Sequence, residues 1–491
     1  MFDSGSPQVY VTFFLLFHGV DVKNCLSLFE EGVGQLVNRL PFLAGDVSPS
    51  PTGQKFTEQI QPCQETLAAI PIYKVKYNGE PMARVMDQLG LVIWHKAFCP
   101  LPPLLDSVAG RPVVRFQGTG LPDGVVLGTS FNHRVFDIVG IDLVFRSLAA
   151  CCSASSAGTT IPCPLPLNVD HDLQVRQELS DYRGQNWNDS ARYGANYRHY
   201  SPFMESAIAA HNTKMYTFAS DRLASIRSIC NSLIPECTES VSSPTSYIST
   251  SDVLNAILAI CIQRSRAKRQ TQPLSVQRPG ELSFAVNLRP MLQEQIDANG
   301  YFGNLITMLQ VSPITPSNLP GPEYPRFDLL QITNLALRIR QKLQTVDNEY
   351  VQQLGSYLDR QKDYLSLKFS DVSFTNHRAW NIYDLNFGKT LGKIDALRYE
   401  TWPIDGFCVV MPARINDPSS WADVVITLTP AVLETLDTDP LFNFLLSREQ
   451  LVTARPGVIP SSSFGIGASC QNPISGKCSC LDALLWPSGL N

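Results

Sequence analysis

The sequence predicts a mixed α/β fold built from two domains. Apolar, strand-like runs alternate with helix-like periodic stretches along the chain, which is typical of sheets covered by helices. With 491 residues, the chain is longer than one hydrophobic core usually supports. Its composition, 44% hydrophobic and 17% charged, is that of an ordinary globular protein. We therefore expect one domain over residues 1–200 and a second over residues 201–491.

The hydrophobic pattern indicates the first two elements. Residues 9–17, VYVTFFLLF, form an unbroken apolar run that predicts a buried strand. This run is too short to cross a bilayer and lacks the basic flank of a signal peptide, so we expect no membrane span. From Leu26 to Leu40, apolar residues recur at steps of three and four, which predicts an amphipathic helix that Pro41 ends.

A second strand is predicted over residues 124–132, GVVLGTSFN, and it leads directly to His133. Beyond Gly140 the apolar residues return at helical spacing, so His133 and Asp137 should lie in a strand-to-helix connection. A His and an Asp four residues apart are a weak signal by themselves. The histidine can be a strand end held by a backbone hydrogen bond, and the aspartate can be a helix cap.

The middle of the chain predicts a long crossover between the domains. Residues 151–200 are rich in Ser, Pro and Asn and lose the apolar periodicity. Regular patterns then resume. We expect helices over residues 249–269 and 328–344, and strands over residues 282–288, 305–311 and 421–430.

Charge and cysteine usage exclude several classes of protein. A net charge of −5 gives no sign of a nucleic-acid surface. The 13 cysteines are irregularly spaced and odd in number, which favours reduced thiols and a cytoplasmic location. Cys470, Cys478 and Cys480 could be metal ligands, but no fourth ligand follows at zinc-like spacing, so no metal site is expected.

The sequence around His133 resembles that of a known family. GTSFNHRVFDIVGI is similar to the HxxxD region of the BAHD acyltransferases, which acylate alcohols and amines from coenzyme A thioesters. Far downstream, YDLNFGKTLGK resembles the DFGxG signature of the same family. LPFLAGDV, AVNLRP and YFGN follow the family's order, so the likeness covers nearly the whole chain. It is strongest to fungal enzymes that acetylate trichothecenes.

This resemblance implies a fold and a reaction. The fold would be two domains of the chloramphenicol-acetyltransferase type with a central channel between them. An acyl-CoA, most simply acetyl-CoA, and a small-molecule alcohol of fungal secondary metabolism would bind together in the channel. The acyl group would pass directly from the thioester to the alcohol. The enzyme would be a monomer without a permanently bound cofactor. The acceptor itself cannot be read from the sequence.

The resemblance also assigns roles to individual residues. His133 would be the general base, and Asn376 would donate a hydrogen bond to the oxyanion, although Asn376 can equally be a turn residue. Asp137 would pair with Arg289 and hold the loop of His133. Three further residues would support the site structurally: Gly140, Asn386 and Gly388.

A basic run follows the predicted helix at residues 249–269. Arg264, Arg266, Lys268 and Arg269 could bind the phosphates of coenzyme A, or could simply be a solvated helix end. The glycine-rich SSSFGIGAS at residues 461–469 lacks the flanking strand and helix of a nucleotide motif, and we interpret it as a loop.

The sequence departs from the family pattern in three places. Ile138 and Asn386 stand where the family has a glycine and an aspartate, and the chain begins late relative to its relatives. A β-branched residue disfavours positive φ, so the His133 loop could differ. Two alternatives stay open. The HxxxD motif also resembles the HHxxxDG motif of peptide-synthetase condensation domains, and Ile138 and Asn386 would fit a catalytically degenerate relative that binds a metabolite.

Overall fold

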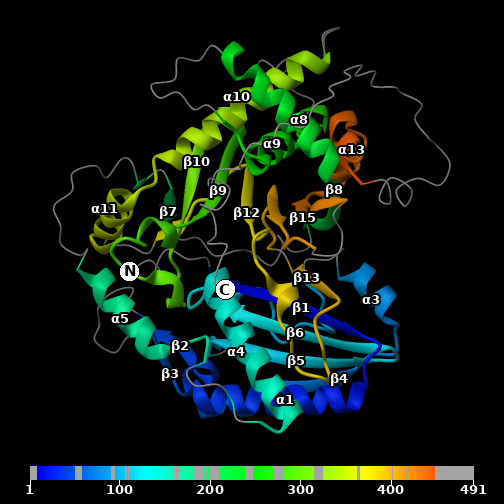
Figure 1. Cartoon of the computed structure of the whole chain (residues 1–491), viewed down its shortest axis with the longest axis vertical. Helices are drawn as coiled ribbons and strands as arrows, with labels where there is room; N and C mark the ends of the chain where they lie inside the picture. Colours follow the sequence, from blue (N-terminus) through cyan, green and yellow to red (C-terminus); the bar gives the residue numbers. More distant parts are fainter. Residues whose placement is uncertain are drawn as a thin grey trace.

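The computed structural model describes residues 8–49, 58–89, 94–105, 108, 110–159, 161, 165–181, 193–194, 196–199, 210–237, 247–269, 280–314, 324–361, 365–400, 402–414 and 419–447. The three C-terminal cysteines and the loop at 461–469 lie outside these residues. Figure 1 shows two sheets, one in the upper and one in the lower half of the molecule, each with its own helices. The mixed α/β class is confirmed.

The lower sheet has five strands. Their order is β13 (Ala396–Glu400), β1 (Tyr10–His18), β6 (Gly124–Asn132), β5 (Val114–Leu121) and β4 (Tyr73–Tyr77). β4 runs parallel to β5, and the other neighbours are antiparallel. One face is covered by α1 (Val22–Arg39) and α4 (Ile138–Ala157), which pack together with alternate residues of β1 into one core. The predicted first strand and helix are confirmed.

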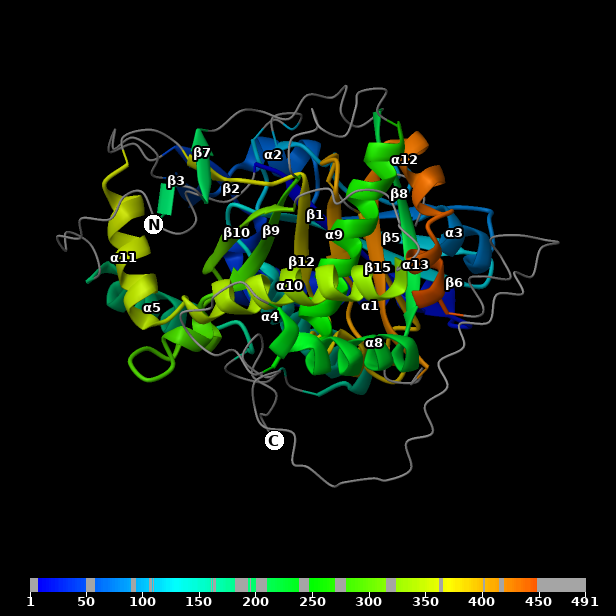
Figure 2. The same cartoon turned by 90° about the horizontal axis from the view of Figure 1, so that it is seen from above.

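The upper sheet has six strands. Their order is β10 (Ile306–Ile314), β9 (Gly280–Asn287), β12 (Val372–Asn376), β14 (Phe407–Val410), β15 (Ser420–Leu428) and β8 (Asn212–Ala219). Helices α8 (Ser220–Leu233), α9 (Thr250–Arg269) and α10 (Tyr324–Gln344) cover it and form the second core, and Figure 2 shows α8 and α10 crossing the direction of the strands. The helices and strands predicted for the second half are confirmed within a few residues.

Smaller elements complete the chain. Two short sheets pair β2 (Asp46–Pro49) with β3 (Glu58–Gln61), and β7 (Tyr197–His199) with β11 (Leu365–Leu367). The remaining α-helices are α2 (Gln64–Ala69), α3 (Met82–Gln88), α5 (Val169–Ser180), α11 (Asn348–Asp359), α12 (Pro430–Leu436) and α13 (Pro440–Leu445).

The strand β13 crosses from the second half of the chain into the lower sheet. It pairs with β1 from Thr12 opposite Glu400 to Leu16 opposite Ala396. A single boundary at residue 200 is therefore wrong for this segment. A pairing between strands that lie more than 370 residues apart leaves no mark on composition or periodicity.

The irregular crossover predicted over residues 151–200 is wrong in part. Helix α4 continues to Ala157, and α5 forms within the stretch, capped by Asn168, whose side chain accepts from the N–H of Asp170 at 3.0 Å. The Asn168 cap and the packing of one face of α5 stabilise this helix. Its sequence has no continuous apolar stripe, so the hydrophobic pattern alone does not predict it.

Helix α4 is, by length and hydropathy, apolar enough to cross a membrane, and it is the one such helix within the described parts of the chain. Its apolar character has a structural cause. Ile141, Val144, Phe145 and Leu148 are buried in the core that α4 shares with α1 and the lower sheet. The helix is thus covered by the protein itself.

Glu400 ends β13 as a buried carboxyl group. Its Oε1 accepts from the backbone N–H of His95 at 3.0 Å and from Sγ of Cys99 at 3.1 Å. Burial raises its pKa to about 8, so the folded protein holds a proton that the unfolded chain releases. The free energy of unfolding should therefore fall as pH rises from about 4.5 to about 8, by at most about 1.4 kcal/mol per pH unit.

Glu400→Gln tests this linkage. The amide keeps an acceptor for His95 and Cys99 but cannot ionise, so the variant should gain stability over the wild type as pH rises from 5 to 9. Urea unfolding at pH 5, 7 and 9 measures the difference. Parallel pH profiles for the two proteins would show that Glu400 does not titrate in this range.

Candidate active site

A cavity lies where the two sheets face each other, with a free volume of about 50 Å³. Val11 and the start of α4 line it from the lower sheet, and Ala285, Phe374 and Phe407 line it from the upper sheet. Residues of both halves thus meet at one place, as predicted. The volume has room for only a few water molecules.

His133 follows β6 and reaches this cavity. Its N–H donates to the carbonyl of Val9 at 3.1 Å, and its carbonyl accepts from the side-chain amide of Asn304 at 2.8 Å. The backbone is held from both sides, while the imidazole lines the cavity. A general base must come within hydrogen-bond distance of the substrate proton, and a histidine at the wall of a cavity can do so.

The surroundings keep His133 neutral. Burial lowers the pKa of His133, and the nearby backbone carbonyls and Asp137 oppose this only in part. The indole ring of Trp402 lies beside the imidazole, with 5.2 Å between the ring centroids, and stacks in turn on Phe407 at 5.0 Å. These aromatic rings restrict the imidazole, which can accept a proton near neutral pH.

Asp137 forms the predicted ion pair with Arg289. Nη1 of Arg289 lies 2.7 Å from Oδ2 and Nη2 lies 3.1 Å from Oδ1, and both side chains are buried. The carboxylate also caps α4 by accepting from the N–H groups of Val139 and Gly140, at 3.0 and 3.2 Å. All of these contacts hold the loop after His133 in place.

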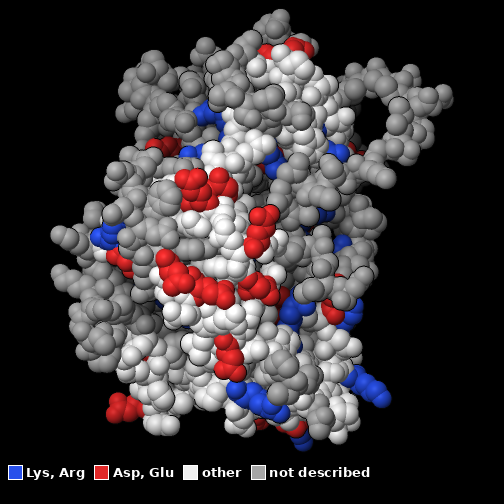
Figure 3. Space-filling model, turned by 60° about the vertical axis from the view of Figure 1, so that its left-hand side comes forward, with Lys and Arg blue, Asp and Glu red and all other residues white. Residues whose placement is uncertain are grey.

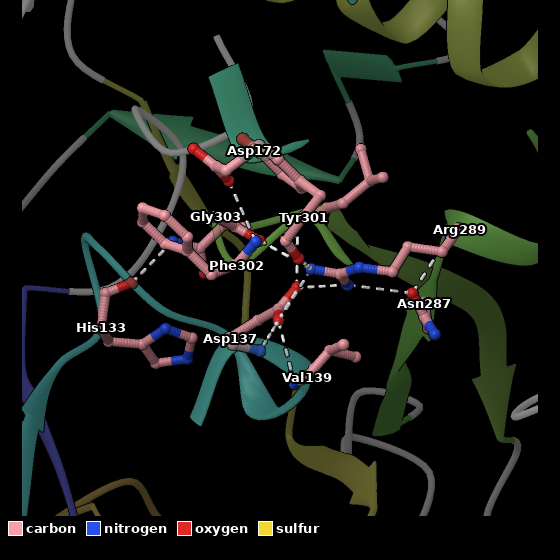
Figure 4. A network of polar contacts seen from close by, with 12 residues as sticks. His133, Asp137, Val139, Asp172, Asn287, Arg289, Tyr301, Phe302 and Gly303 are labelled. Atoms are coloured by element: carbon pink, nitrogen blue, oxygen red, sulfur yellow. Dashed lines mark hydrogen bonds and ion pairs between the residues drawn. The ribbon is translucent and has the colours of Figure 1, made fainter. Parts of the chain in front are cut away.

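The same ion pair ties in the segment after Arg289. Figure 4 shows the Asp137 carboxylate turned toward Arg289, with the His133 imidazole standing apart from the pair. Nη2 of Arg289 also donates to the carbonyls of Tyr301 and Gly303, at 2.9 and 2.8 Å. YFGN thereby sets Asn304 against the carbonyl of His133, which makes Asn304 a supporting residue that the sequence argument did not name.

The departure at Ile138 does not distort the loop. Ile138 is the first residue of α4 and has no positive φ; within the described ranges, Arg111 is the one non-glycine residue that does. Gly140 is needed for space instead. A Cβ atom there would lie 2.0 Å from the carbonyl oxygen of Phe302, so any side chain would push the YFGN segment away.

Gly140→Ala should destabilise the protein by about 1–3 kcal/mol because it overpacks this contact. Gly34→Ala is the matched control: Gly34 also lies in a helix, α1, but has nothing within 4 Å of the added atom. Alanine there should stabilise by about 0.5–1 kcal/mol. Urea unfolding of both variants measures the difference. Equal effects would remove the close approach as the reason for a glycine at 140.

Asn376 does not face the cavity, and the prediction that it is the oxyanion donor is wrong. Its amide donates to Oγ of Ser251 at 3.3 Å, and its Oδ1 accepts from the N–H of Arg378 at 2.9 Å. Thr375 and His377 line the cavity, and Asn376 between them points the other way.

The sequence argument thus chose the wrong residue of this segment. The strand over residues 372–376 brings Thr375 to the cavity, and His377 follows directly after it. Their side chains are joined, with Nε2 of His377 3.1 Å from Oγ1 of Thr375. Two imidazoles therefore share the cavity with two hydroxyl-bearing side chains, Thr375 and Tyr399.

The NFGKTLG motif is structural, as predicted. Oδ1 of Asn386 accepts from the N–H of Gly388 at 3.0 Å, so asparagine keeps the acceptor of the family's aspartate. Gly388 has φ +97°, and a Cβ there would lie 2.8 Å from Ser156 of α4. Phe387 packs on Phe17 of β1, with 5.4 Å between ring centroids. The motif anchors β13 to the lower layer, away from the cavity.

The basic run at the end of α9 does not line the cavity. Arg264 forms ion pairs with Asp328 at 3.0 Å and Asp439 at 3.3 Å, and Arg266 with Asp405 at 2.7 Å. Their charges are balanced within the upper layer, which weakens the assignment of Arg264 and Arg266 to coenzyme A; for both, that contact stays a prediction.

The other two residues of the run are exposed. Arg269 contacts Oγ1 of Thr435 at 2.7 Å and Glu434 at 3.3 Å, a weak surface pairing, and Lys268 is exposed at the last turn. For Lys268 and Arg269, a contact with coenzyme A stays a prediction.

One face of the molecule is acidic. Asp and Glu side chains gather across the middle of the face in Figure 3, and Lys and Arg side chains lie scattered around them. Such a field repels the phosphates of coenzyme A. We expect the coenzyme to enter from another side.

Comparisons with known proteins agree with this arrangement. A model of the Transferase family matches residues 95–442. The chain is 31% identical over 486 residues to fumigaclavine B O-acetyltransferase of Aspergillus fumigatus, covering 91% of this chain and 96% of that protein. It is 30% identical to communesin N16 acyltransferase of Penicillium expansum, covering 89% and 95%.

Solved structures share the fold. F. graminearum TRI101, complexed with coenzyme A and deoxynivalenol, superimposes with a TM-score of 0.68 at 20% identity, covering 89% of this chain and 95% of that one. Vinorine synthase gives 0.59 at 15% identity, covering 91% and 92%. Since the family model spans residues 95–442 and the sequence likeness extends over nearly the whole chain, the protein belongs to the Transferase family of BAHD enzymes and is an acyltransferase.

Proposed function

We propose that the protein transfers an acetyl group from acetyl-CoA to a hydroxyl group of a fungal secondary metabolite, with His133 as general base. One observation carries the proposal: the imidazole of His133, whose pKa is lowered by burial, lines a cavity between the two sheets that Thr375 also lines. Relatives from Penicillium roqueforti and Aspergillus oryzae are likewise named O-acetyltransferases, which supports the acetyl group and the alcohol.

The reaction needs one proton acceptor. An alcohol attacks a thioester only if its proton is removed, so His133 takes the proton as the oxygen bonds to the carbonyl carbon. The tetrahedral intermediate expels the thiolate of coenzyme A, which takes the proton back from the imidazolium. The products are an ester, free coenzyme A and a neutral His133, and no step attaches the acetyl group to the protein.

The tetrahedral intermediate also needs a hydrogen-bond donor for its negative oxygen. Thr375 lines the cavity with His133, and its hydroxyl group can donate. Thr375 therefore takes the role that we had predicted for Asn376.

The wall of the cavity limits the acceptor. Five aromatic side chains line it: Phe369, Phe374, Tyr399, Trp402 and Phe407. Walls of this kind bind apolar ring systems and orient them through a few polar groups. They favour a polycyclic alcohol over a sugar. Fumigaclavine B and other hydroxylated alkaloids are the first acceptors to test, because a relative is named for that compound.

Liquid chromatography with mass spectrometry tests the proposal on purified protein, acetyl-CoA and this set of acceptors. We expect an ester heavier by one acetyl group and an equal amount of free coenzyme A. Acetyl-CoA binding without any product would favour the degenerate metabolite-binding relative. An amide product would show that the acceptor atom is nitrogen rather than oxygen, as the name of communesin N16 acyltransferase indicates for that relative.

The condensation-domain alternative has less support. The first condensation domain of the CDA synthetase shares the fold, at 13% identity and a TM-score of 0.52, but curated relatives of this chain at about 30% identity are named acyl- or acetyltransferases. Transfer from a carrier-bound acyl group, with none from acetyl-CoA, would restore that alternative. The cytoplasmic location and the monomeric state stay predictions.

A further inference from the structure

We propose that His377 is a positioning residue, which holds the hydroxyl group of Thr375 with its proton directed into the cavity, toward the oxyanion. This inference rests on the proposed function, because it assumes that an oxyanion forms beside Thr375. The role of His377 is distinct from that of His133: one imidazole moves a proton during the reaction, and the other fixes a donor.

The His377 ring is held firmly. Its backbone N–H donates to the carbonyl of Val410 at 2.8 Å, and its carbonyl accepts from the N–H of Trp380 at 2.9 Å. The rings of Trp380 and Tyr399 stand edge-on to the imidazole, at centroid distances of 6.4 and 6.2 Å. Nε2 thus stays 3.1 Å from Oγ1 of Thr375.

The position of the imidazole proton follows from the other ring nitrogen. Nδ1 of His377 is buried and has no hydrogen-bond partner in the described parts of the chain. A proton on Nδ1 would be a buried, unpaired N–H donor, which is rarer and less favourable than a bare acceptor. Nε2 therefore carries the proton and donates to Oγ1 of Thr375.

This tautomer decides where the hydroxyl proton points. A threonine hydroxyl has one donor and two acceptor positions. When His377 donates to Oγ1, the hydroxyl proton cannot point back at Nε2 and is left for the cavity. The reverse tautomer would turn the proton toward His377 and leave only lone pairs facing the negative oxygen, which would repel it.

His377 also does not compete for the substrate proton. Burial, and then the charge of the nearby His133, lower the pKa of His377 to about 3. The imidazole stays neutral across the working range of His133. It is a donor of fixed direction rather than a second base.

Steady-state kinetics with acetyl-CoA, and with whichever acceptor the screen identifies, test the inference in four variants. Thr375→Val should lower kcat about 10²-fold, as the loss of an oxyanion donor does. His377→Phe, which keeps a ring, should lower kcat about 10-fold in the wild type but less than about 2-fold in the T375V background, because the two residues act as one unit. KM for acetyl-CoA should change little.

His377→Gln separates the donor from the ring. Its amide nitrogen reaches about as far as Nε2, so kcat should stay within about 3-fold of the wild type. His18→Phe, at an exposed histidine that ends β1, is the matched control and should leave kcat unchanged. Equal losses from H377F in both backgrounds, or an H377Q variant as slow as H377F, would overturn the inference.

A measurement without turnover separates this inference from the proposed function. The chain has 7 histidines, so nitrogen-15 labelling of histidine gives few ring signals, and H377Q identifies those of His377. We expect the Nε2–H tautomer, unchanged from pH 5 to 8 and shifted by T375V. A proton on Nδ1 would refute the positioning role even in an active enzyme. If the expected tautomer is found but no ester forms, the result would instead count against the proposed function.

Discussion

Replacing His133 by alanine should lower kcat about 10²- to 10⁴-fold while leaving the fold and acetyl-CoA binding intact. The imidazole lines the cavity, and the hydrogen bonds at 3.1 and 2.8 Å that hold this loop come from the backbone of His133 rather than from its ring. Steady-state kinetics, with circular dichroism and calorimetric titration of acetyl-CoA, measure the three quantities.

The pH dependence adds a second criterion. Because the pKa of His133 is lowered, kcat/KM should rise with pH below neutrality and level off before pH 7. Residual H133A activity should lose this acidic limb. A variant that keeps most of the wild-type kcat, or the same acidic limb, would transfer the base to another group.

Breaking the ion pair of Asp137 and Arg289 should have the largest effect on stability. Arg289→Met leaves the buried carboxylate without its partner and removes the donor to the carbonyls of Tyr301 and Gly303. Removing one member of a buried pair costs about 3–5 kcal/mol. Asp137→Asn should cost less, because the amide oxygen still caps α4, but it should also lower kcat by loosening the loop of His133.

The control is an exposed pair. Lys393 and Asp384 lie 3.3 Å apart with more than half of each side chain exposed, so Lys393→Met should change the free energy of unfolding by less than about 1 kcal/mol. Urea unfolding at pH 7 compares the variants. If Arg289→Met is no worse than Lys393→Met, the pair does not hold the loop. The acidic limb of Asp137→Asn should move to lower pH without disappearing, because the Asp137 charge raises the pKa of His133.

The secondary structure followed well from hydrophobic periodicity. β1, α1, β6 and α9 were predicted within a few residues, because each buries a continuous run or one face. The helix α5 was missed, since its contacts come from segments distant in the chain. The position of β13 in the lower sheet was missed for the same reason: only the folded chain brings Glu400 next to Thr12.

Site residues were predicted correctly where a motif determines both the residue type and the backbone conformation around it. His133, Asp137 and Arg289 lie as expected, because a strand end, a helix cap and a buried charge each constrain the backbone. Asn376 was wrong because its side chain turns to Ser251 and to the backbone of Arg378, contacts that no motif reveals. The ion pairs of Arg264 were not foreseen either: its partner Asp439 lies 175 positions along the chain, so the sequence does not reveal that the charge is balanced.

Tracing a labelled acetyl group through a single turnover tests the central claim most directly, that the group passes straight from the thioester to the alcohol beside His133. Excess wild-type protein is mixed with labelled acetyl-CoA and the acceptor, quenched in acid at intervals, and separated into protein, ester and coenzyme A. We expect ester to form in step with free coenzyme A, with no label on the protein at any time. Label that appears on the protein before the ester, and then moves into it, would contradict direct transfer and require a nucleophile in the cavity.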